Sequence, residues 1–299
     1  MKLLVTGGGG QLGRALTRLA AAAGHELRAP TRAELDIADD AALRDACAWA
    51  EVVINAAAYT DVNRAESERE AAFAVNAAAP GRLAEHCAAG GSLPLHVSTD
   101  YVFDGRAQRP WRETDPTGPL SIYGESKRAG EDAVRAALEH HLIVRTSWVY
   151  SETGRNFLTT MLRLGAEREE LSVVDDQIGT PTSAEDLAAA LLHLAVRARE
   201  EEGPFGTYHY SAEGTASWAD FAEAIFAEAG DLLPARPRVT RIESSAYPTP
   251  ARRPAYSVLD CSRIVADFDP PRRAWQQGLS AVMARLKLQE VGQEKMESR

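Results

Sequence analysis

A glycine-rich turn directly after the first apolar segment is the strongest constraint on the fold. Residues 2–6 read KLLVT, which is typical of a buried strand, and TGGGGQLG follows with Gly7, Gly10 and Gly13. An alanine- and leucine-rich helical stretch covers residues 11–23. Between a strand and a helix, such glycines permit a tight turn, close approach of a pyrophosphate, and close packing of the helix on the strand. The pattern predicts dinucleotide binding; the alternative is a tight turn without a ligand.

The strand–helix alternation continues to about residue 147. Strand-like segments lie at 25–30, 51–58, 93–99 and 141–147, and helical segments lie between them. This order predicts an α/β fold with a Rossmann-like, doubly wound parallel sheet and a smaller mixed α/β C-terminal lobe. We assign residues 1–147 to the dinucleotide-binding domain, with 171–202 returning to it. We assign 148–170 and 203–287 to the substrate-binding lobe, and 288–299 to a polar tail with a composition typical of disorder.

Composition excludes several classes of protein. The 299 residues carry a formal charge of −10, which disfavours nonspecific nucleic-acid binding, since phosphate contacts need clustered Lys and Arg. No segment is long and apolar enough to predict a membrane span or a signal peptide. Three widely spaced cysteines and seven histidines show no metal-ligand spacing, so no metal is expected. These features predict a cytoplasmic protein without nucleic-acid or membrane partners.

The segment after the second predicted strand bears on the choice of cofactor. A carboxylate at the tip of this strand would bind the ribose 2′-hydroxyl of NAD, whereas an arginine would accept the 2′-phosphate of NADP. Arg32 follows Ala29-Pro30-Thr31, and Glu34 and Asp36 lie close by. We therefore expect NADPH, with NADH as the alternative. Arg32 could also be a solvated loop charge.

The stretch SIYGESKRAG places Tyr123 and Lys127 four residues apart, on one face of a predicted helix. A free phenol is a poor acid–base group at neutral pH, but a nearby ammonium stabilises the phenolate and lowers the phenol pKa. A surface pair without function is the alternative. The preceding strand ends in Ser98-Thr99, at the carboxyl edge where α/β sheets bind ligands, which favours a catalytic pair.

Together, the glycine pattern and YGESK resemble the extended short-chain dehydrogenase/reductase superfamily. Within it, the chain resembles the dTDP-4-dehydrorhamnose reductase family from residue 3 to about residue 285. The resemblance is carried by NAAAYT (55–60), STDYVFDG (98–105), RTSWVY (145–150) and DDQIGTPT (175–182). It implies an NAD(P)H-dependent reductase that acts on a dTDP-linked 4-keto-6-deoxysugar, converting dTDP-6-deoxy-L-lyxo-4-hexulose to dTDP-L-rhamnose.

The resemblance also implies roles for individual residues. Tyr123 would donate the proton, Lys127 would hold the nicotinamide ribose, and Thr99 would hydrogen-bond the same carbonyl oxygen. The cofactor candidates are Gly7, Gly10, Gln11, Leu12, Gly13, Arg32, Asp36, Ile37, Ala56, Ala57, Ala58, Tyr59, Tyr123 and Lys127. The substrate candidates are Thr60, Val62, Thr99, Asp100, Tyr123, Trp148, Asn156, Gln177, Arg252 and Arg253. Trp148 could instead be a core aromatic, and the two arginines could be solvated.

Several alternatives stay open on the sequence. Related dehydratases carry Asp-Glu after the threonine, whereas this chain has Asp100-Tyr101, which favours simple ketone reduction. The chain could reduce a different nucleotide-linked 4-ketosugar. It could also act without catalysis, as does the related regulatory subunit of methionine adenosyltransferase. A metal-bridged pairing described in the family uses an acid where this chain has Ala15, so we predict either a monomer or a homodimer without metal.

Overall fold

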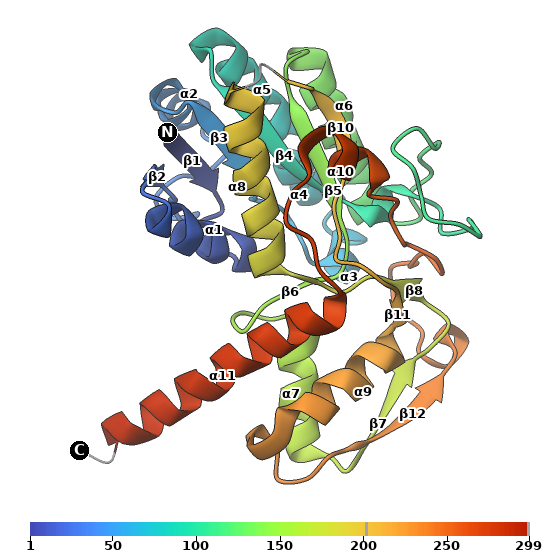
Figure 1. Cartoon of the computed structure of the whole chain (residues 1–299). Coiled ribbons are helices and arrows are strands. Elements are labelled where there is room, and N and C mark those ends of the chain that lie inside the picture. The colour runs from blue at the N-terminus through green and yellow to red at the C-terminus, as the bar shows by residue number, and fades with distance from the viewer. Residues whose placement is uncertain (201–202, 298–299) are drawn as a thin grey trace.

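The computed structural model describes residues 1–200 and 203–297, which form a larger and a smaller lobe (Figure 1). The larger lobe contains a six-stranded sheet in the order β10-β5-β4-β3-β1-β2, and every neighbouring pair is parallel. Its strands are β1 (Lys2–Thr6), β2 (Glu26–Arg28), β3 (Val52–Asn55), β4 (Leu93–Thr99), β5 (Leu142–Thr146) and β10 (Gly206–His209). The connections reverse direction between β1 and β3, which is where such sheets bind ligands.

Helices cover both faces of this sheet (Figure 1). On one face α1 (Gln11–Ala22) packs against α8 (Ala184–Glu200), and on the other lie α2 (Asp40–Trp49), α5 (Ala79–Gly90) and α6 (Ile122–Ala137). Because both faces are covered, β3 and β5 are buried at every residue, as expected for central parallel strands. Shorter elements of this lobe are α3 (Val62–Ala65), α4 (Arg69–Phe73), the π-helical η1 (Ala74–Ala78), η2 (Asp100–Val102) and α10 (Ser262–Phe268).

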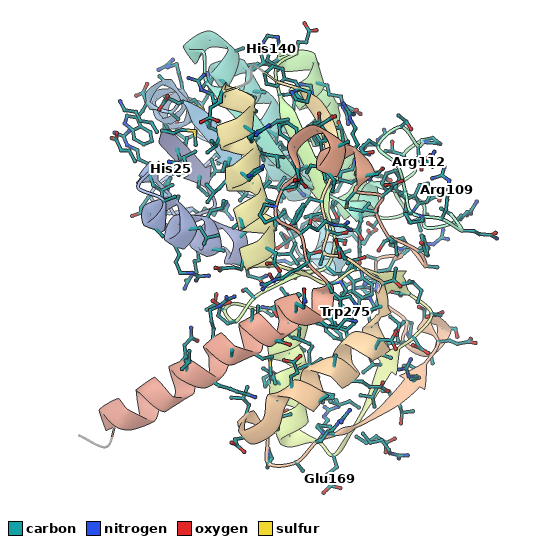
Figure 2. All side chains as sticks on the ribbon, viewed as in Figure 1. His25, Arg109, Arg112, His140, Glu169 and Trp275 are labelled. Carbon is teal, nitrogen blue, oxygen red and sulfur yellow. The ribbon has the colours of Figure 1, made fainter. Side chains whose placement is uncertain are left out.

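The smaller lobe has its own apolar core, formed by helices packed on short strand pairs. Its helices are α7 (Phe157–Glu167), α9 (Trp218–Ala229), η3 (Gly230–Leu232), η4 (Ser244–Ala246) and α11 (Trp275–Glu297). The strand pairs are β7 (Glu170–Val174) with β12 (Arg238–Ile242), and β8 (Ile178–Gly179) with β11 (Ala216–Ser217). The short pair β6 (Val149–Tyr150) and β9 (Thr182–Ser183) joins the lobes. Figure 2 shows Trp275 at the start of α11, near this junction.

Two strands differ from the predicted division into lobes. We predicted that 171–202 returns to the larger lobe, but β7 pairs with β12 and contributes Leu171 and Val173 to the core of the smaller lobe. We predicted that 203–287 belongs to the smaller lobe, but β10 pairs with β5 at the edge of the main sheet. A short apolar strand carries no local signal of the sheet that it will join, because its partners lie far away in sequence.

The C-terminal segment also differs from its sequence-based description. Helix α11 covers residues 288–297, where we predicted a polar tail, and residues 298–299 of that tail lie outside the described residues. Within residues 1–200 and 203–297, no helix combines the length and apolar character needed to cross a bilayer.

Candidate active site

One large cavity of about 1750 Å³ opens at the carboxyl edge of the central sheet. The turn after β1, the ends of β3 and β4, the start of α6 and several segments of the smaller lobe line it. Every residue selected above as a catalytic, cofactor or substrate candidate lies in its wall. The structure therefore brings together segments that are up to about 240 residues apart in sequence.

The glycine turn forms one end of the cavity. Gly7 follows β1 with φ of +73°, a left-handed conformation that glycine adopts without strain. A Cβ atom on Gly13 would lie 2.3 Å from the Gly7 carbonyl oxygen, so only glycine permits this approach of α1 to β1. Helix α1 begins directly after Gly10, which offers no side chain to cap it. The free N–H groups of this helix terminus fit a pyrophosphate.

The segment after β2 carries the residues that were expected to discriminate NADP from NAD. Arg32 is exposed and lines the cavity. The Glu34 carboxylate accepts hydrogen bonds from the Thr31 backbone nitrogen at 2.7 Å and from its hydroxyl at 2.8 Å, which lower the pKa of Glu34. Asp36 also lines the cavity and accepts a hydrogen bond from the Ala38 nitrogen at 3.0 Å. The Glu34 carboxylate is thus used within a local turn. Arg32 is the cation that the segment after β2 presents to the cavity.

The segment from Ala56 to Thr60 continues from β3 along the cavity wall. Asn76, which is buried in η1, holds this segment in place. Its Oδ1 accepts from the Tyr59 nitrogen at 2.8 Å, and its Nδ2 donates to the Tyr59 carbonyl at 3.0 Å and to Ser126 Oγ at 3.0 Å. One side chain therefore connects the cavity wall to α6, the helix that carries the catalytic candidates.

Thr99, Tyr123 and Lys127 converge from β4 and α6. Ser121 caps α6 by accepting a hydrogen bond from the Gly124 nitrogen at 3.2 Å, which places Tyr123 and Lys127 on successive turns. A Cβ atom on Gly124 would lie 2.3 Å from the Tyr101 carbonyl oxygen, so glycine allows α6 to approach the end of β4. The rings of Tyr101 and Tyr123 meet edge to face, with centroids 5.7 Å apart.

Burial shifts the pKa of both members of the Tyr–Lys pair. It raises the pKa of Tyr123 to about 12, while a hydrogen bond with Thr99 acts in the lowering direction and the Asp100 charge adds to the rise. Burial lowers the pKa of Lys127 to about 8, with Glu131 opposing the change. The sequence predicted that Lys127 would lower the pKa of Tyr123, and the structure corrects this because loss of solvation outweighs the hydrogen bond with Thr99, which acts in the lowering direction. A phenol with a raised pKa keeps its proton at neutral pH.

Asp100 provides an unpaired acceptor beside Thr99. Its side chain is buried, Oδ1 accepts from the Thr99 hydroxyl at 2.9 Å, and Oδ2 has no hydrogen-bond partner. Burial raises the pKa of Asp100 to about 7, against lowering contributions from Ser257 and Thr99. A buried unpaired oxygen in a cavity wall is a binding position for a ligand hydroxyl.

Trp148 lies in the cavity wall with an unusual backbone. Its φ is +49°, a conformation that costs free energy for a bulky residue and is often found at functional sites. Its indole stacks on Trp218 with ring centroids 3.5 Å apart. Gln177 accepts a hydrogen bond from Trp218 Nε1 at 3.2 Å and donates to Ser244 Oγ at 2.8 Å. The amide of Gln177 therefore orients Trp218, and the predicted contact of Gln177 with the substrate stays a prediction.

Asn156 lines the cavity, but its amide begins a helix. It accepts from the Thr159 nitrogen at 3.1 Å as the N-cap of α7 and donates to the Ser151 carbonyl at 2.9 Å and the Thr153 carbonyl at 3.2 Å. These bonds occupy both its donor and its acceptor groups. Its contact with the nucleotide sugar stays a prediction, and the structure shows Asn156 as a helix cap in the cavity wall.

Two arginines complete the wall on the side of the smaller lobe. Arg252 is exposed, whereas Arg253 is half-buried. The Arg253 guanidinium donates to Thr249 Oγ1 within its own loop and to Asn63 Oδ1 of α3 at 3.2 Å. Arg253 therefore connects the two lobes across the cavity.

Comparisons with known proteins agree with this geometry. A family model described as the RmlD substrate binding domain matches residues 1–288. A dTDP-4-dehydrorhamnose reductase of Mycobacterium tuberculosis is 44% identical over 292 residues, which cover 95% of this chain and 92% of the relative. This chain belongs to the dTDP-4-dehydrorhamnose reductase family.

Solved structures of dTDP-4-dehydrorhamnose reductases have the same fold. One from Clostridium acetobutylicum matches with a TM-score of 0.89 and 37% identity, covering 96% of this chain and all of that one. One from Bacillus anthracis, in complex with NADP, matches with a TM-score of 0.89 and 34% identity, covering 95% and 99% of the two chains. These matches and the parallel sheet confirm the predicted fold class and the resemblance to an extended short-chain reductase.

Sequence reasoning missed several residues of this reductase site. Trp218 stacks on Trp148 from 70 residues away, Asn76 contacts α6 from outside the selected motifs, and Tyr101 contacts Tyr123 although it was not selected as a site residue. No spacing in the sequence could have paired the two tryptophans, because their contact depends on packing between α9 and the segment after β5. Tyr101 adjoins Asp100, so a wider reading of STDYVFDG could have included it.

Proposed function

We propose that this chain reduces the 4-keto group of dTDP-6-deoxy-L-lyxo-4-hexulose to give dTDP-L-rhamnose, with NADPH as preferred hydride donor and NADH as the alternative. The observation that carries this proposal is the single cavity that joins the glycine turn, the Thr99–Tyr123–Lys127 group and the arginines of the smaller lobe. Its volume of about 1750 Å³ exceeds that of most small-molecule sites, in keeping with a dinucleotide and a nucleotide sugar bound together.

The residues of the larger lobe fit the cofactor. The close approach of Gly13 to Gly7 and the uncapped start of α1 suit a pyrophosphate, and exposed Arg32 suits a 2′-phosphate. A related reductase of known structure was solved in complex with NADP, which supports the same preference here. When bound, the reduced nicotinamide supplies the hydride.

In this proposal Tyr123 delivers the proton. Its raised pKa keeps the phenol protonated at neutral pH, and the alkoxide that forms on the substrate is a stronger base than the phenolate. Lys127 is buried on the next turn of α6, where its positive charge stabilises the phenolate left behind. Thr99 holds the carbonyl oxygen near Tyr123, in keeping with the Thr99–Tyr123 hydrogen bond that affects the Tyr123 pKa.

The neighbours of the catalytic group favour reduction over dehydration. Dehydration of a sugar needs an acid to expel a hydroxyl, and the residue after Asp100 is Tyr101. Tyr101 is half-buried and places a phenol where the related dehydratases carry a carboxylic acid, so the acid that would expel the hydroxyl is missing here. The unpaired Oδ2 of Asp100 can instead accept a hydrogen bond from a hydroxyl of the sugar.

The test is to incubate the purified protein with NADPH and the ketosugar. We expect NADPH oxidation and a product identical to dTDP-L-rhamnose by chromatography and NMR. Tyr123→Phe should lower kcat by about 10²- to 10⁴-fold, because the proton donor is lost, and should leave the NADPH dissociation constant nearly unchanged. If NADPH is oxidised only with another nucleotide-linked 4-ketosugar, the proposed substrate is wrong. No oxidation with any of them would contradict the reductase proposal.

A further inference from the structure

A row of buried polar side chains leads from Lys127 into the central sheet. Thr6 ends β1, Asn55 ends β3 and His96 lies in β4, and each of these side chains is about 1% exposed. Thr6 Oγ1 lies 2.6 Å from Asn55 Oδ1, Asn55 Nδ2 lies 3.0 Å from His96 Nδ1, and His96 Nε2 lies 3.4 Å from Lys127 Nζ. We call Thr6, Asn55 and His96 the polar chain. Burying these three side chains together with Lys127 is costly unless all four are hydrogen-bonded.

The geometry defines the direction of each hydrogen bond. Thr6 donates to Asn55 Oδ1, so the Asn55 amide nitrogen, which can only donate, faces His96 Nδ1. A neutral His96 then carries its proton on Nε2, directed at Lys127. His96 is neutral because burial, followed by the charges of Lys127 and Arg135, lowers its pKa well below the ordinary value. In this order of hydrogen bonds His96 Nε2 donates to Lys127 Nζ, which can accept only if the Lys127 amine is uncharged.

A second order satisfies the charged form of Lys127. If the Asn55 amide turns over, its Oδ1 accepts from His96 Nδ1, and His96 Nε2 becomes an acceptor for the Lys127 ammonium. Thr6 Oγ1 then accepts from the Asn55 amide nitrogen. The Val97 carbonyl accepts from Lys127 Nζ at 2.7 Å in either case. His96 Nε2 can therefore donate to the uncharged amine of Lys127 in the first order and accept from its ammonium in the second.

Other charged groups also face this site. Glu131, on the next turn of α6, raises the pKa of Lys127, but it is shared with Arg145 at 2.7 Å and with Arg135 at 2.7 Å. Asp100 and Tyr123 lie on the cavity side. Because Glu131 is already paired with two arginines, His96 is the neighbour best placed to respond to the proton on Lys127.

We infer that His96 is a positioning residue for Lys127, and that with Asn55 and Thr6 it stabilises the Lys127 ammonium at the pH of the reaction. A hydrogen bond from an ammonium is charge-assisted and stronger than one to a neutral amine, so the polar chain favours the charged form overall. This inference rests on the proposed function in one respect, because there the Lys127 ammonium stabilises the Tyr123 phenolate during the reduction. The hydrogen-bond relation itself can be tested without cofactor or substrate.

The direct test is an NMR titration of the lysine side chains in the free protein. The sequence contains only four lysines, Lys2, Lys127, Lys287 and Lys295, and a Lys127→Met variant identifies the Lys127 signal. We expect Lys127 to titrate near its lowered pKa of about 8. His96→Leu removes the acceptor and should lower the Lys127 pKa by about one unit. His96→Gln keeps an acceptor and a donor and should return it toward the wild-type value.

Asn55→Asp provides the opposite perturbation with almost the same shape. A carboxylate can only accept, so it holds the His96 proton on Nδ1 and leaves Nε2 as an acceptor for the ammonium. This variant should therefore raise the Lys127 pKa by about one unit. The added charge also attracts the ammonium directly, so the fall in His96→Leu and its reversal in His96→Gln are what distinguish the polar chain from a general charge effect.

The outcomes separate this inference from the proposed function. An unchanged Lys127 pKa in both variants, or shifts in the same direction, would overturn it. If His96→Leu does not fold, a wild-type Lys127 pKa in Asn55→Asp would overturn it. In an active enzyme the alkaline limb of kcat should move down for His96→Leu and up for Asn55→Asp. Opposite NMR shifts in a protein that reduces no ketosugar would support the polar chain while contradicting the reductase proposal.

Discussion

At the residue scale, the site contains side chains whose burial opposes their charge. Asp100 is the clearest example, because its carboxyl group is buried beside Thr99 and one of its oxygens has no partner. Its pKa is raised to about 7, so the folded protein binds a proton that the unfolded chain releases at a lower pH. The contribution of Asp100 to stability is therefore present below the pKa of an unfolded aspartate, and it is lost as the pH rises to about 7.

Asp100→Asn should accordingly stabilise the free protein in a pH-dependent manner. Asparagine has nearly the same shape and carries no charge, so the penalty for a buried carboxylate disappears at high pH. We expect the gain in Tm to be about 5 °C larger at pH 8 than at pH 5. Differential scanning calorimetry at the two pH values measures this difference, with Asp104→Asn as the control at a nearby half-buried turn position. An equal gain in Tm at pH 5 and pH 8 would show that Asp100 is already charged at pH 5.

At the scale of the elements, the turn between β1 and α1 determines how close a ligand can come to the sheet. Gly13 lies within the first turn of α1, and the Gly7 carbonyl oxygen occupies the space that any Cβ at position 13 would need. The same approach brings the uncapped start of α1 to the cavity. Helix packing thus depends on one absent side chain, and the proposed binding of a pyrophosphate depends on it too.

Gly13→Ala should weaken NADPH binding at least about tenfold, because α1 must move away from β1 to make room for the added methyl group. Fluorescence titration with NADPH measures the dissociation constant. Gly90→Ala is the matched control, since a Cβ there would make an ordinary 3.6 Å contact with Ala48 and position 90 lies outside the cavity. Wild-type affinity in Gly13→Ala would contradict a cofactor at this turn.

At the scale of the whole molecule, two lobes with separate apolar cores share one cavity. Polar contacts hold the lobes together around it. Arg253 reaches from the smaller lobe to Asn63 of α3, and Glu152 pairs with Arg18 of α1 at 3.5 Å and with Arg285 of α11 at 3.3 Å. A ligand that contacts both lobes stabilises the folded protein with the lobes in this relative position.

Arg253→Met should therefore affect the sugar substrate more than the cofactor. It removes a cation expected near the diphosphate together with a contact between the lobes, and we expect KM for the sugar nucleotide to rise about tenfold. Arg163→Met is the control, because Arg163 pairs with Glu167 on the exposed face of α7 and lies outside the cavity wall. Steady-state kinetics at saturating NADPH measures the change. An unchanged KM in Arg253→Met would place the diphosphate elsewhere.

Much of this architecture is readable from short stretches of the chain. The glycine turn, the apolar strands and the four-residue spacing of Tyr123 and Lys127 depend on backbone geometry and periodicity over fewer than ten residues. Such features predicted the fold class, the glycine turn and the Tyr–Lys pair, and the family resemblance supplied the other candidate residues, all of which line one cavity. The family motifs extended this to a reaction, because each motif occupies a strand end where the fold gathers ligand contacts.

Contacts between distant segments decided the rest. The membership of β7 and β10 in their sheets, the stacking of Trp148 on Trp218 and the polar chain beneath Lys127 all join residues more than 30 positions apart. The direction of the Tyr123 pKa shift also escaped local reasoning, because it depends on how much solvent the folded protein removes. Solvation and hydrogen-bond partners belong to the assembled molecule, since neighbours in space create them and neighbours in sequence do not.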